Sequence, residues 1–248
     1  MAAVSCLARG RHLAARLLGY GRRGTRGKRP GAFVTFSLLA GLWALPGVAA
    51  AQDEPLQLLA FGDSLTQGYG LPQGEGLVPQ LESWLRERGQ DVTVINGGVS
   101  GDTTAGGLSR IAWSLTPDVD AVMVTLGGND LLRGLDPADT RTNLDGILTE
   151  IAVRDLPMML VGMQAPGNYG TAYQQAFDGL YPELAEAHDA VYVPSFLAPL
   201  MGDPEAPDPA AARAFLQADG IHPNAEGVAR IVEALGPQVE DLLARVDR

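Results

Sequence analysis

The chain has 248 residues, of which 46% are hydrophobic and 19% are charged, so it can bury a core and is not globally disordered. Its formal charge of −11 is uneven, because residues 1–51 hold eight basic residues and no acidic one, while residues 52–248 hold ten basic and 29 acidic residues. A body this acidic repels phosphate backbones and anionic lipid surfaces, which argues against nucleic acid as a partner.

Residues 1–51 have the three parts of a secretory signal, namely a basic head, an apolar run over residues 32–45 and an end of small residues. We therefore predict a signal peptide with a long basic n-region at 1–51, cleaved near residues 49–51, and a mature domain at 52–248. The protein would then be periplasmic or secreted in a bacterium, with no stable membrane insertion after processing.

Two alternatives to a general secretion signal stay open. Arg22-Arg23 raises a twin-arginine signal, although the residues that follow match that pattern poorly. An uncleaved membrane anchor is the other alternative. The apolar run is shorter than the roughly 20 residues that a membrane-spanning helix needs, which argues against the anchor.

Short apolar runs then alternate with segments of helical periodicity. We predict strands at 56–61, 92–95, 121–126, 158–162 and 191–193, and helices at 76–88, 103–115, 137–153, 172–188 and 224–245. We expect Pro182 to break the fourth of these helices. Apolar strands that alternate with helices indicate a mostly parallel sheet covered on both faces, with its ligand site beyond the carboxyl ends of the strands.

Residues 52–248 contain no cysteine, since Cys6 is the only one in the chain, so this part has no disulfide, thiolate nucleophile or cysteine-based zinc site. His188 and His222 are its only imidazoles, which argues against a multi-histidine metal site, and we predict no metal ion. His188 lies in a helical segment next to Asp189, so we expect it at the surface.

Polar, glycine-rich segments follow the first three predicted strands, and a parallel sheet brings such segments to one crevice. Ser64 follows the first strand at a strand-to-helix transition, where its hydroxyl and amide can face that crevice. The alternative is that Ser64 caps the helix. Gly101 follows the second strand and lets a substrate oxygen approach a backbone N–H closely, because it has no Cβ. The alternative there is a turn with a helix cap at Asp102 or Thr103.

Two further segments offer polar side chains for chemistry. Asn129 follows the third strand and carries neutral N–H donors that suit a developing oxyanion, although an Asn-Asp turn explains it equally well. Asp219 lies three residues before His222, close enough for its carboxylate to accept a hydrogen bond from one ring nitrogen. The other nitrogen is then free to act as a base. A surface turn with a solvated histidine is the alternative.

Together these segments resemble the four blocks of the SGNH (GDSL) hydrolases, and the resemblance covers residues 56–245. The blocks are Gly62-Asp63-Ser64-Leu65, Gly101, Gly128-Asn129-Asp130 and Asp219-Gly220-Ile221-His222. The order Ser, Asp, His also matches the α/β-hydrolases, but their G-x-S-x-G elbow is absent, because Thr66 stands where that motif needs Gly. Within the SGNH family, the longer strings around the blocks resemble bacterial periplasmic esterases of the thioesterase, protease and lysophospholipase (arylesterase) subgroup.

The resemblance implies a flavodoxin-like three-layer α/β/α sandwich with a mostly parallel five-stranded sheet and no cofactor. It implies that Ser64 is the nucleophile, that His222 acts as base and then as acid, and that Asp219 orients the histidine. The oxyanion hole would consist of the backbone N–H groups of Ser64 and Gly101 and the side-chain amide of Asn129.

The resemblance also implies roles around these residues. Asp63 and Asp130 would hold their loops through hydrogen bonds. The segment after the fourth strand is similar to the substrate-lining loop of the subgroup, and three of its side chains are predicted to bind substrate: Pro166, Asn168 and Tyr169. Gly167 stands where Pro or Ala is expected, which would loosen this loop and shift the acyl-chain preference.

We therefore expect a monomeric serine esterase that hydrolyses carboxylic esters or thioesters, such as aryl esters, acyl-CoA or lysophospholipids, through an acyl-enzyme. A carbohydrate O-acetylesterase of the same fold is the alternative. Four leucines favour acyl chains over sugars: Leu71, Leu131, Leu132 and Leu135. A doubly wound domain that binds a nucleotide without hydrolysis is the third reading, but Lys28 is the only lysine, so no G-x-x-x-x-G-K-[ST] loop exists.

Overall fold

The five expected strands form one parallel sheet in the computed structural model, which describes residues 54–203 and 205–247. The strands are β1 (Leu56–Gly62), β2 (Val92–Gly98), β3 (Ala121–Thr125), β4 (Met158–Val161) and β5 (Val191–Val193), in the order β2-β1-β3-β4-β5. The chain moves outward from β1 to β2 and then crosses back to β3 on the other side of β1. Ligand sites of open parallel sheets lie at such a reversal. The predicted signal peptide lies outside the described residues.

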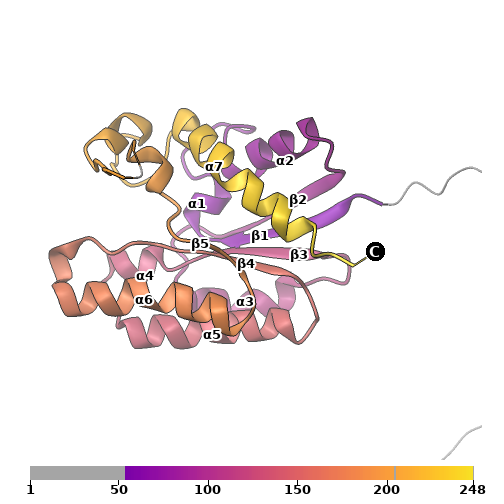
Figure 1. Cartoon of the computed structure of the whole chain (residues 1–248), viewed down its shortest axis with the longest axis horizontal. Coiled ribbons are helices and arrows are strands. Elements are labelled where there is room, and N and C mark those ends of the chain that lie inside the picture. The colour runs from indigo at the N-terminus through magenta and orange to yellow at the C-terminus, as the bar shows by residue number, and fades with distance from the viewer. Residues whose placement is uncertain (1–53, 204, 248) are drawn as a thin grey trace, which may run out of the picture. The chain divides into compact units, whose positions relative to one another are not determined.

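Helices cover both faces of the sheet (Figure 1). One face carries α2 (Leu77–Glu87) and α7 (Ala225–Leu243), and the other carries α3 (Thr104–Ser114), α5 (Pro137–Ala152) and α6 (Thr171–Ala187). The predicted three-layer α/β/α sandwich is therefore confirmed, with every strand parallel. Among the helices that the structure describes, none is long and apolar enough to cross a membrane.

Several short elements lie outside the predicted pattern, because they span too few residues to show a period. They are α1 (Ser64–Gln67), α4 (Gly128–Leu132) and the 3₁₀ turns η1 (Gly167–Tyr169), η2 (Ala198–Leu200) and η3 (Ala211–Phe215). The two short α-helices directly follow the ends of β1 and β3. Ser64 and Asn129 therefore lie in short helices, whereas Gly101 and the segment of Asp219 and His222 lie in turns outside the helices.

The core explains why the central strands read as continuous apolar runs. All five residues of β3 and all four of β4 are buried, since helices cover the sheet on both faces. Phe61 and Met123 are completely buried between these layers. Full burial of one such side chain stabilises a fold by about 1.5–3 kcal/mol.

The prediction that Pro182 breaks its helix is wrong, because α6 continues through it from Thr171 to Ala187. A proline inside a helix removes one hydrogen bond and costs about 3 kcal/mol. Buried side chains on both sides of Pro182 offset this cost, among them Phe177 and Leu184. Tyr181 is also fully buried, and its hydroxyl donates to the carbonyl oxygen of Leu126 at 3.0 Å.

The close contact between α2 and α7 depends on a glycine. A Cβ on Gly236 of α7 would lie only 2.4–2.6 Å from atoms of the Trp84 ring on α2. The indole Nε1 of Trp84 also donates to Glu233 Oε2 at 2.7 Å, which fixes the ring against α7. The ring therefore has little freedom to move away from an added methyl group.

We expect Gly236→Ala to destabilise the protein by about 1–3 kcal/mol, because the methyl group overpacks the contact with Trp84. Gly179→Ala on α6 is the matched control, since its Cβ would make only an ordinary 3.7 Å contact with Glu183. Removing a helical glycine there should stabilise the protein by about 0.5–1 kcal/mol. Urea unfolding measures both changes, and an unchanged or raised stability of the Gly236 variant would contradict this account of the packing.

Candidate active site

The ends of β1, β2 and β3 meet at one cleft, together with the segment before α7. The cleft has a volume of about 360 Å³, and its walls include Ser64, Gly101, Asn129 and His222. These residues come from four separate parts of the chain. The structure thus brings together the three residues that the sequence analysis selected after strand ends and the histidine that it selected before the last helix.

Ser64 is the first residue of α1, and Asp63, not Ser64, caps this helix. The Asp63 carboxylate accepts a hydrogen bond from the backbone N–H of Leu65 at 3.0 Å. Ser64 is 9% exposed, and its hydroxyl points to the histidine and not to the helix end. Only glycine fits at position 62, because a Cβ there would overlap Thr66 Oγ1 and the carbonyl oxygen of Thr125.

A chain of hydrogen bonds joins Asp219, His222 and Ser64. The Nε2 atom of His222 lies 2.8 Å from Ser64 Oγ, and its Nδ1 atom lies 2.7 Å from Asp219 Oδ2. The second carboxylate oxygen of Asp219 accepts from the backbone N–H groups of Ile221 and His222, at 2.9 and 3.0 Å. The carboxylate is thus held on both oxygens, and it holds the ring with one nitrogen toward Ser64.

The hydrogen bond from the His222 ring, followed by the two backbone N–H groups, lowers the pKa of Asp219 from 3.8 to about 2. A carboxylate that accepts several hydrogen bonds is stabilised in its charged form. Asp219 is therefore ionised in neutral and mildly acidic solution. Its negative charge favours a proton on the Nδ1 atom of His222, which leaves Nε2 as the acceptor that faces Ser64.

Two residues that the sequence analysis did not select hold the histidine in place. The Tyr69 ring packs against the His222 ring with 4.7 Å between their centroids. The side-chain amide of Gln217 donates to the carbonyl oxygens of Tyr69 and Pro223, at 2.8 and 3.0 Å, and its backbone N–H donates to His222 O at 2.7 Å. Gln217 thus ties the histidine segment to the loop after α1. Nothing in the spacing of these residues predicts the contact, since they lie 148 positions apart.

Asn129 lies on α4 beside Ser64 in the wall of the cleft. Its Nδ2 atom donates to Asp63 Oδ2 at 3.1 Å, so Asp63 links the segments after β1 and β3. Burial is the main cause that raises the pKa of Asp63 from 3.8 to about 6, and the hydrogen bonds from Leu65 and Asn129 oppose it. These two hydrogen bonds are contacts by which Asp63 can hold its loop, the role that was predicted for it.

Asp130 holds together the helices on the face of the sheet that carries α3 and α5. Its carboxylate is buried and accepts from the backbone N–H of Thr104 at 2.9 Å and from the Thr104 hydroxyl at 2.6 Å. The Thr140 hydroxyl approaches the same carboxylate at 3.5 Å. Asp130 therefore ties α4 to the start of α3 and to α5.

Gly101 lies in the turn between β2 and α3 with a φ of +80°, a conformation that favours glycine. The Nη2 atom of Arg133 donates to the carbonyl oxygen of Gly101 at 2.8 Å. The alternative of a helix cap applies to Thr103, whose side chain accepts from Gly106 N at 3.3 Å. Asp102 is not the cap and instead pairs with Arg110.

The walls of the cleft are mostly apolar. Eight side chains contribute to this surface: Leu65, Tyr69, Leu131, Leu132, Met163, Leu197, Met201 and Ile221. Leu131 and Leu132 are two of the four leucines that the sequence analysis associated with acyl chains. The other two, Leu71 and Leu135, lie outside the residues that line the cleft. The surface fits a hydrocarbon group better than a sugar.

The structure does not bring Pro166, Asn168 and Tyr169 into the wall of the cleft. Met163 and Gln164, which precede them, line it instead. The 3₁₀ turn η1 carries Tyr169 over α4, where its hydroxyl donates to the carbonyl oxygen of Leu132 at 3.3 Å. Tyr169 thus supports a cleft residue from outside.

Within residues 54–203 and 205–247, no group of three or more His, Cys, Asp or Glu side chains is placed to hold a metal ion. His188 is half-buried, with 14% of its side chain exposed, and it faces solvent beside the exposed Asp145, which agrees with the expected place at the surface. Its Nε2 atom lies 2.7 Å from Asp145 Oδ1. This contact joins the end of α6 to α5, because the two helices pack side by side.

The geometry of a buried serine, a histidine and a carboxylate at the edge of a parallel sheet agrees with the comparison of whole sequences. The model of the GDSL-like lipase/acylhydrolase family matches residues 60–230. The chain belongs to this family. The match spans all four sequence blocks and begins within β1, the strand that precedes Ser64.

Individual GDSL relatives agree over most of their length. The chain is 36% identical over 208 residues to the esterase TesA of Pseudomonas aeruginosa, covering 83% of this chain and 98% of that protein. It is 36% identical over 195 residues to an arylesterase of Vibrio mimicus, covering 77% and 92% of the two chains. The crystal structure of AlinE4, an SGNH-hydrolase family esterase, superposes with a TM-score of 0.62 at 47% identity, covering 78% and 99%. The predicted family, fold and esterase chemistry are therefore confirmed.

The buried carboxyl of Asp63 gives a prediction about stability and pH. Because its pKa in the folded protein is about 6, above the ordinary 3.8, its contribution to stability is full below pH 3.8 and is lost as the pH rises through 6. Asp63→Asn does not titrate. We therefore expect the unfolding free energy of the variant, relative to wild type, to rise by about 2 kcal/mol between roughly pH 4.5 and pH 7.5.

Urea unfolding at these two pH values tests the expectation. Asp118→Asn, at an exposed position, controls for the loss of one negative charge. A difference between the Asp63 variant and wild type that is the same at both pH values would show that burial does not disfavour the Asp63 carboxylate.

Proposed function

We propose that the protein hydrolyses carboxylic esters or thioesters of apolar acyl groups by two-step acyl transfer on Ser64. The observation that carries this proposal is the continuous hydrogen-bonded chain from Asp219 through His222 to Ser64, at 2.7 and 2.8 Å, beside an apolar cleft. A hydroxyl within hydrogen-bond reach of an oriented imidazole is the arrangement that activates a serine nucleophile.

The reaction follows from the positions of these atoms. Ser64 Oγ attacks the carbonyl carbon while its proton moves to His222 Nε2, and the ionised Asp219 stabilises the resulting imidazolium. The bond to the leaving alcohol or thiol then breaks, and the leaving group takes the proton from Nε2. Water attacks the acyl-enzyme in the same way, which releases the acid and restores the serine.

Three donors surround the place where the oxyanion forms. The backbone N–H of Ser64 lies at the start of α1, the backbone N–H of Gly101 lies in the turn after β2, and Asn129 supplies its side-chain amide. The Nδ2 atom of Asn129 carries two hydrogens, and Asp63 accepts one of them. The second hydrogen serves the oxyanion in this proposal. Because Asn129 is neutral, it stabilises the charge only as it develops.

The apolar walls favour an acyl chain over the sugar of a carbohydrate O-acetylesterase, because a sugar would leave its hydroxyl groups without partners there. The relatives are named esterase, arylesterase and thioesterase 1/protease 1/lysophospholipase L1. We extend these names to the substrate class of this protein, with aryl esters, acyl-CoA and lysophospholipids as candidates. The basic, apolar and small-residue segments of residues 1–51 support export to the periplasm or beyond.

The first test is the hydrolysis of p-nitrophenyl esters from acetate to palmitate by residues 52–248. We expect activity to peak at a medium or long chain, because the cleft is apolar. We expect Ser64→Ala to lower kcat by several orders of magnitude, since the nucleophile is removed. Activity on acetate alone would favour the O-acetylesterase, and activity that survives Ser64→Ala would overturn the proposed nucleophile.

The second test concerns Asn129. We expect Asn129→Ala to lower kcat by about 10²–10³, the loss typical of one oxyanion donor, with a smaller change in KM. Asn143→Ala is the matched control, because the Asn143 amide donates to Thr104 Oγ1 at 3.2 Å, and Asn143 is not among the residues that line the cleft. A kcat near that of wild type in the Asn129 variant would remove Asn129 from the oxyanion hole.

A further inference from the structure

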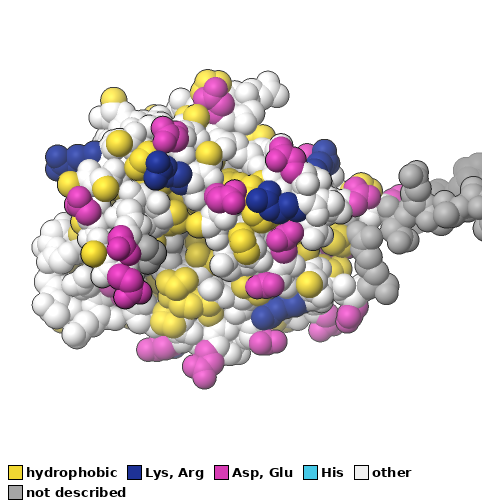
Figure 2. All heavy atoms as spheres, turned by 45° about the horizontal axis from the view of Figure 1, so that its top comes forward, with side chains coloured by type: hydrophobic (Ala, Val, Ile, Leu, Met, Phe, Trp, Pro, Cys, Tyr) yellow, Lys and Arg dark blue, Asp and Glu magenta, His cyan; other side chains and the backbone are white. Residues whose placement is uncertain are grey.

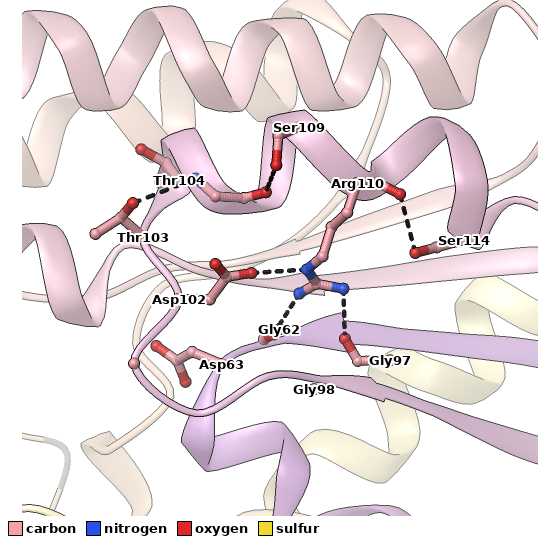
Figure 3. A network of polar contacts seen from close by, with 12 residues as sticks. Gly62, Asp63, Gly97, Gly98, Asp102, Thr103, Thr104, Ser109, Arg110 and Ser114 are labelled. Carbon is pink, nitrogen blue, oxygen red and sulfur yellow. Dashed lines mark hydrogen bonds and ion pairs between the residues drawn. The ribbon is translucent and has the colours of Figure 1, made fainter.

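Arg110 reaches from α3 to the point where β1 and β2 end (Figure 3). Its Nη2 atom donates to the carbonyl oxygen of Gly62 at 2.7 Å, and its Nη1 atom donates to that of Gly97 at 2.9 Å. Its Nε atom lies 2.7 Å from the Asp102 carboxylate. The guanidinium also lies 3.9 Å above the centre of the Phe61 ring. One planar group thus holds the ends of both strands and the turn that follows.

The contacts of Arg110 lie next to two of the proposed oxyanion donors. Gly62 is two residues before Ser64, and Asp102 directly follows Gly101. The structure also ties these segments through Val99, whose backbone N–H donates to Gly62 O at 3.0 Å. Arg110 therefore sets the position of the turn that carries Gly101 relative to the turn that carries Ser64.

A guanidinium suits this place better than any other side chain. It presents five N–H donors in a rigid plane, so it can serve three acceptors at fixed angles, whereas an ammonium group is a flexible point charge. The Arg110 side chain is 22% exposed and that of Asp102 is 15% exposed, so little solvent competes for their contact.

The charge of Arg110 also matters. Asp102 lies near enough to Asp63 to disfavour the charged form of that second carboxyl. Arg110 offsets the negative charge of Asp102 at the edge of the cleft. Without it, an unpaired carboxylate would stand beside the site at which negative charge develops during the reaction.

We propose that Arg110 is a positioning residue for the oxyanion hole. It holds the Gly101 amide at the distance from the Ser64 amide that the transition state requires. This inference rests on the proposed function, because it concerns the same reaction. Arg110 does not touch the substrate. It acts through Gly62, Gly97 and Asp102, and its effect therefore falls on kcat and not on the binding of the acyl chain.

The chain offers a matched control at the other end of β2. Arg86 projects from α2, and its Nε atom donates to the carbonyl oxygen of Val92 at 3.0 Å while its Nη1 atom pairs with Glu82 at 3.0 Å. Arg86 thus binds a β2 carbonyl and a carboxylate, as Arg110 does, but at the amino end of the strand. A general loss of stability should affect both variants, whereas a positioning role should affect only Arg110.

The experiment compares wild type, Arg110→Met, Arg110→Lys and Arg86→Met on one p-nitrophenyl ester, with unfolding measured for each protein. We expect Arg110→Met to lower kcat by about 10², with KM changed less than about threefold, because one or two oxyanion donors are displaced. Arg110→Lys keeps the positive charge but lacks the planar set of N–H donors, so its kcat should lie between those of Arg110→Met and wild type. Arg86→Met should keep the wild-type kcat.

An alkyl boronic acid gives an independent readout. Its boron forms a bond to Ser64 Oγ as the serine proton moves to His222, and a boron-bound oxygen then occupies the oxyanion position. We expect its inhibition constant to rise in Arg110→Met by about the factor by which kcat falls, because transition-state analogues depend on the same donors. A purely structural role for Arg110 would not link these two quantities.

The outcomes separate this inference from the proposed function. If wild-type activity does not depend on Ser64, the proposed function fails. If the activity depends on Ser64 and a folded Arg110→Met keeps kcat within about threefold of wild type, only the role of Arg110 is overturned. An equal loss in Arg86→Met would overturn it as well. Should Arg110→Met fail to fold, Arg110→Lys and Asp102→Asn carry the test, and a wild-type kcat and boronate affinity in both would overturn the proposal.

Discussion

The parallel pairing of β1 with β2 on one side and β3 on the other is the constraint on which the site depends. Because parallel strands all end at the same edge, the segments that follow them must meet there. Ser64 and Asn129 lie 65 positions apart in the sequence, with Gly101 between them, and the sheet brings all three to one cleft. Helices on both faces bury the strands, and this burial supplies the free energy that holds sharp, glycine-dependent turns at the sheet edge.

The charged and polar groups of the protein are distributed in two ways. On the face that carries α2 and α7, acidic side chains are spread over the surface among fewer basic ones (Figure 2). Around the cleft, by contrast, each carboxylate has a specific partner. Asp219 accepts from His222, Asp63 accepts from Asn129 and Asp102 pairs with Arg110. The local contacts keep these three carboxylates from standing without partners beside the cleft.

These pairs also have different tasks. Asp219 is partly exposed and strongly hydrogen-bonded, which keeps it ionised, while Asp63 is buried and has a raised pKa. One carboxyl therefore holds the His222 ring, and the other joins two loops. Environment decides these roles, since the two side chains are chemically identical. The same reasoning separates two arginines. Arg110 is held by three acceptors inside the fold, whereas the exposed Arg133 donates to one carbonyl oxygen, that of Gly101.

The sequence by itself determined the alternation of strands and helices, because buried strands of a covered sheet must be apolar throughout and the flanking helices must show a period. It also pointed to Ser64, Asp219 and His222, because their blocks follow strand ends or lie close together in the chain. Only the tertiary structure decided that α6 continues through Pro182 and that Tyr69, Gln217 and Arg110 support the site. These features depend on contacts between residues far apart in the chain, and local propensity and spacing carry no information about such contacts.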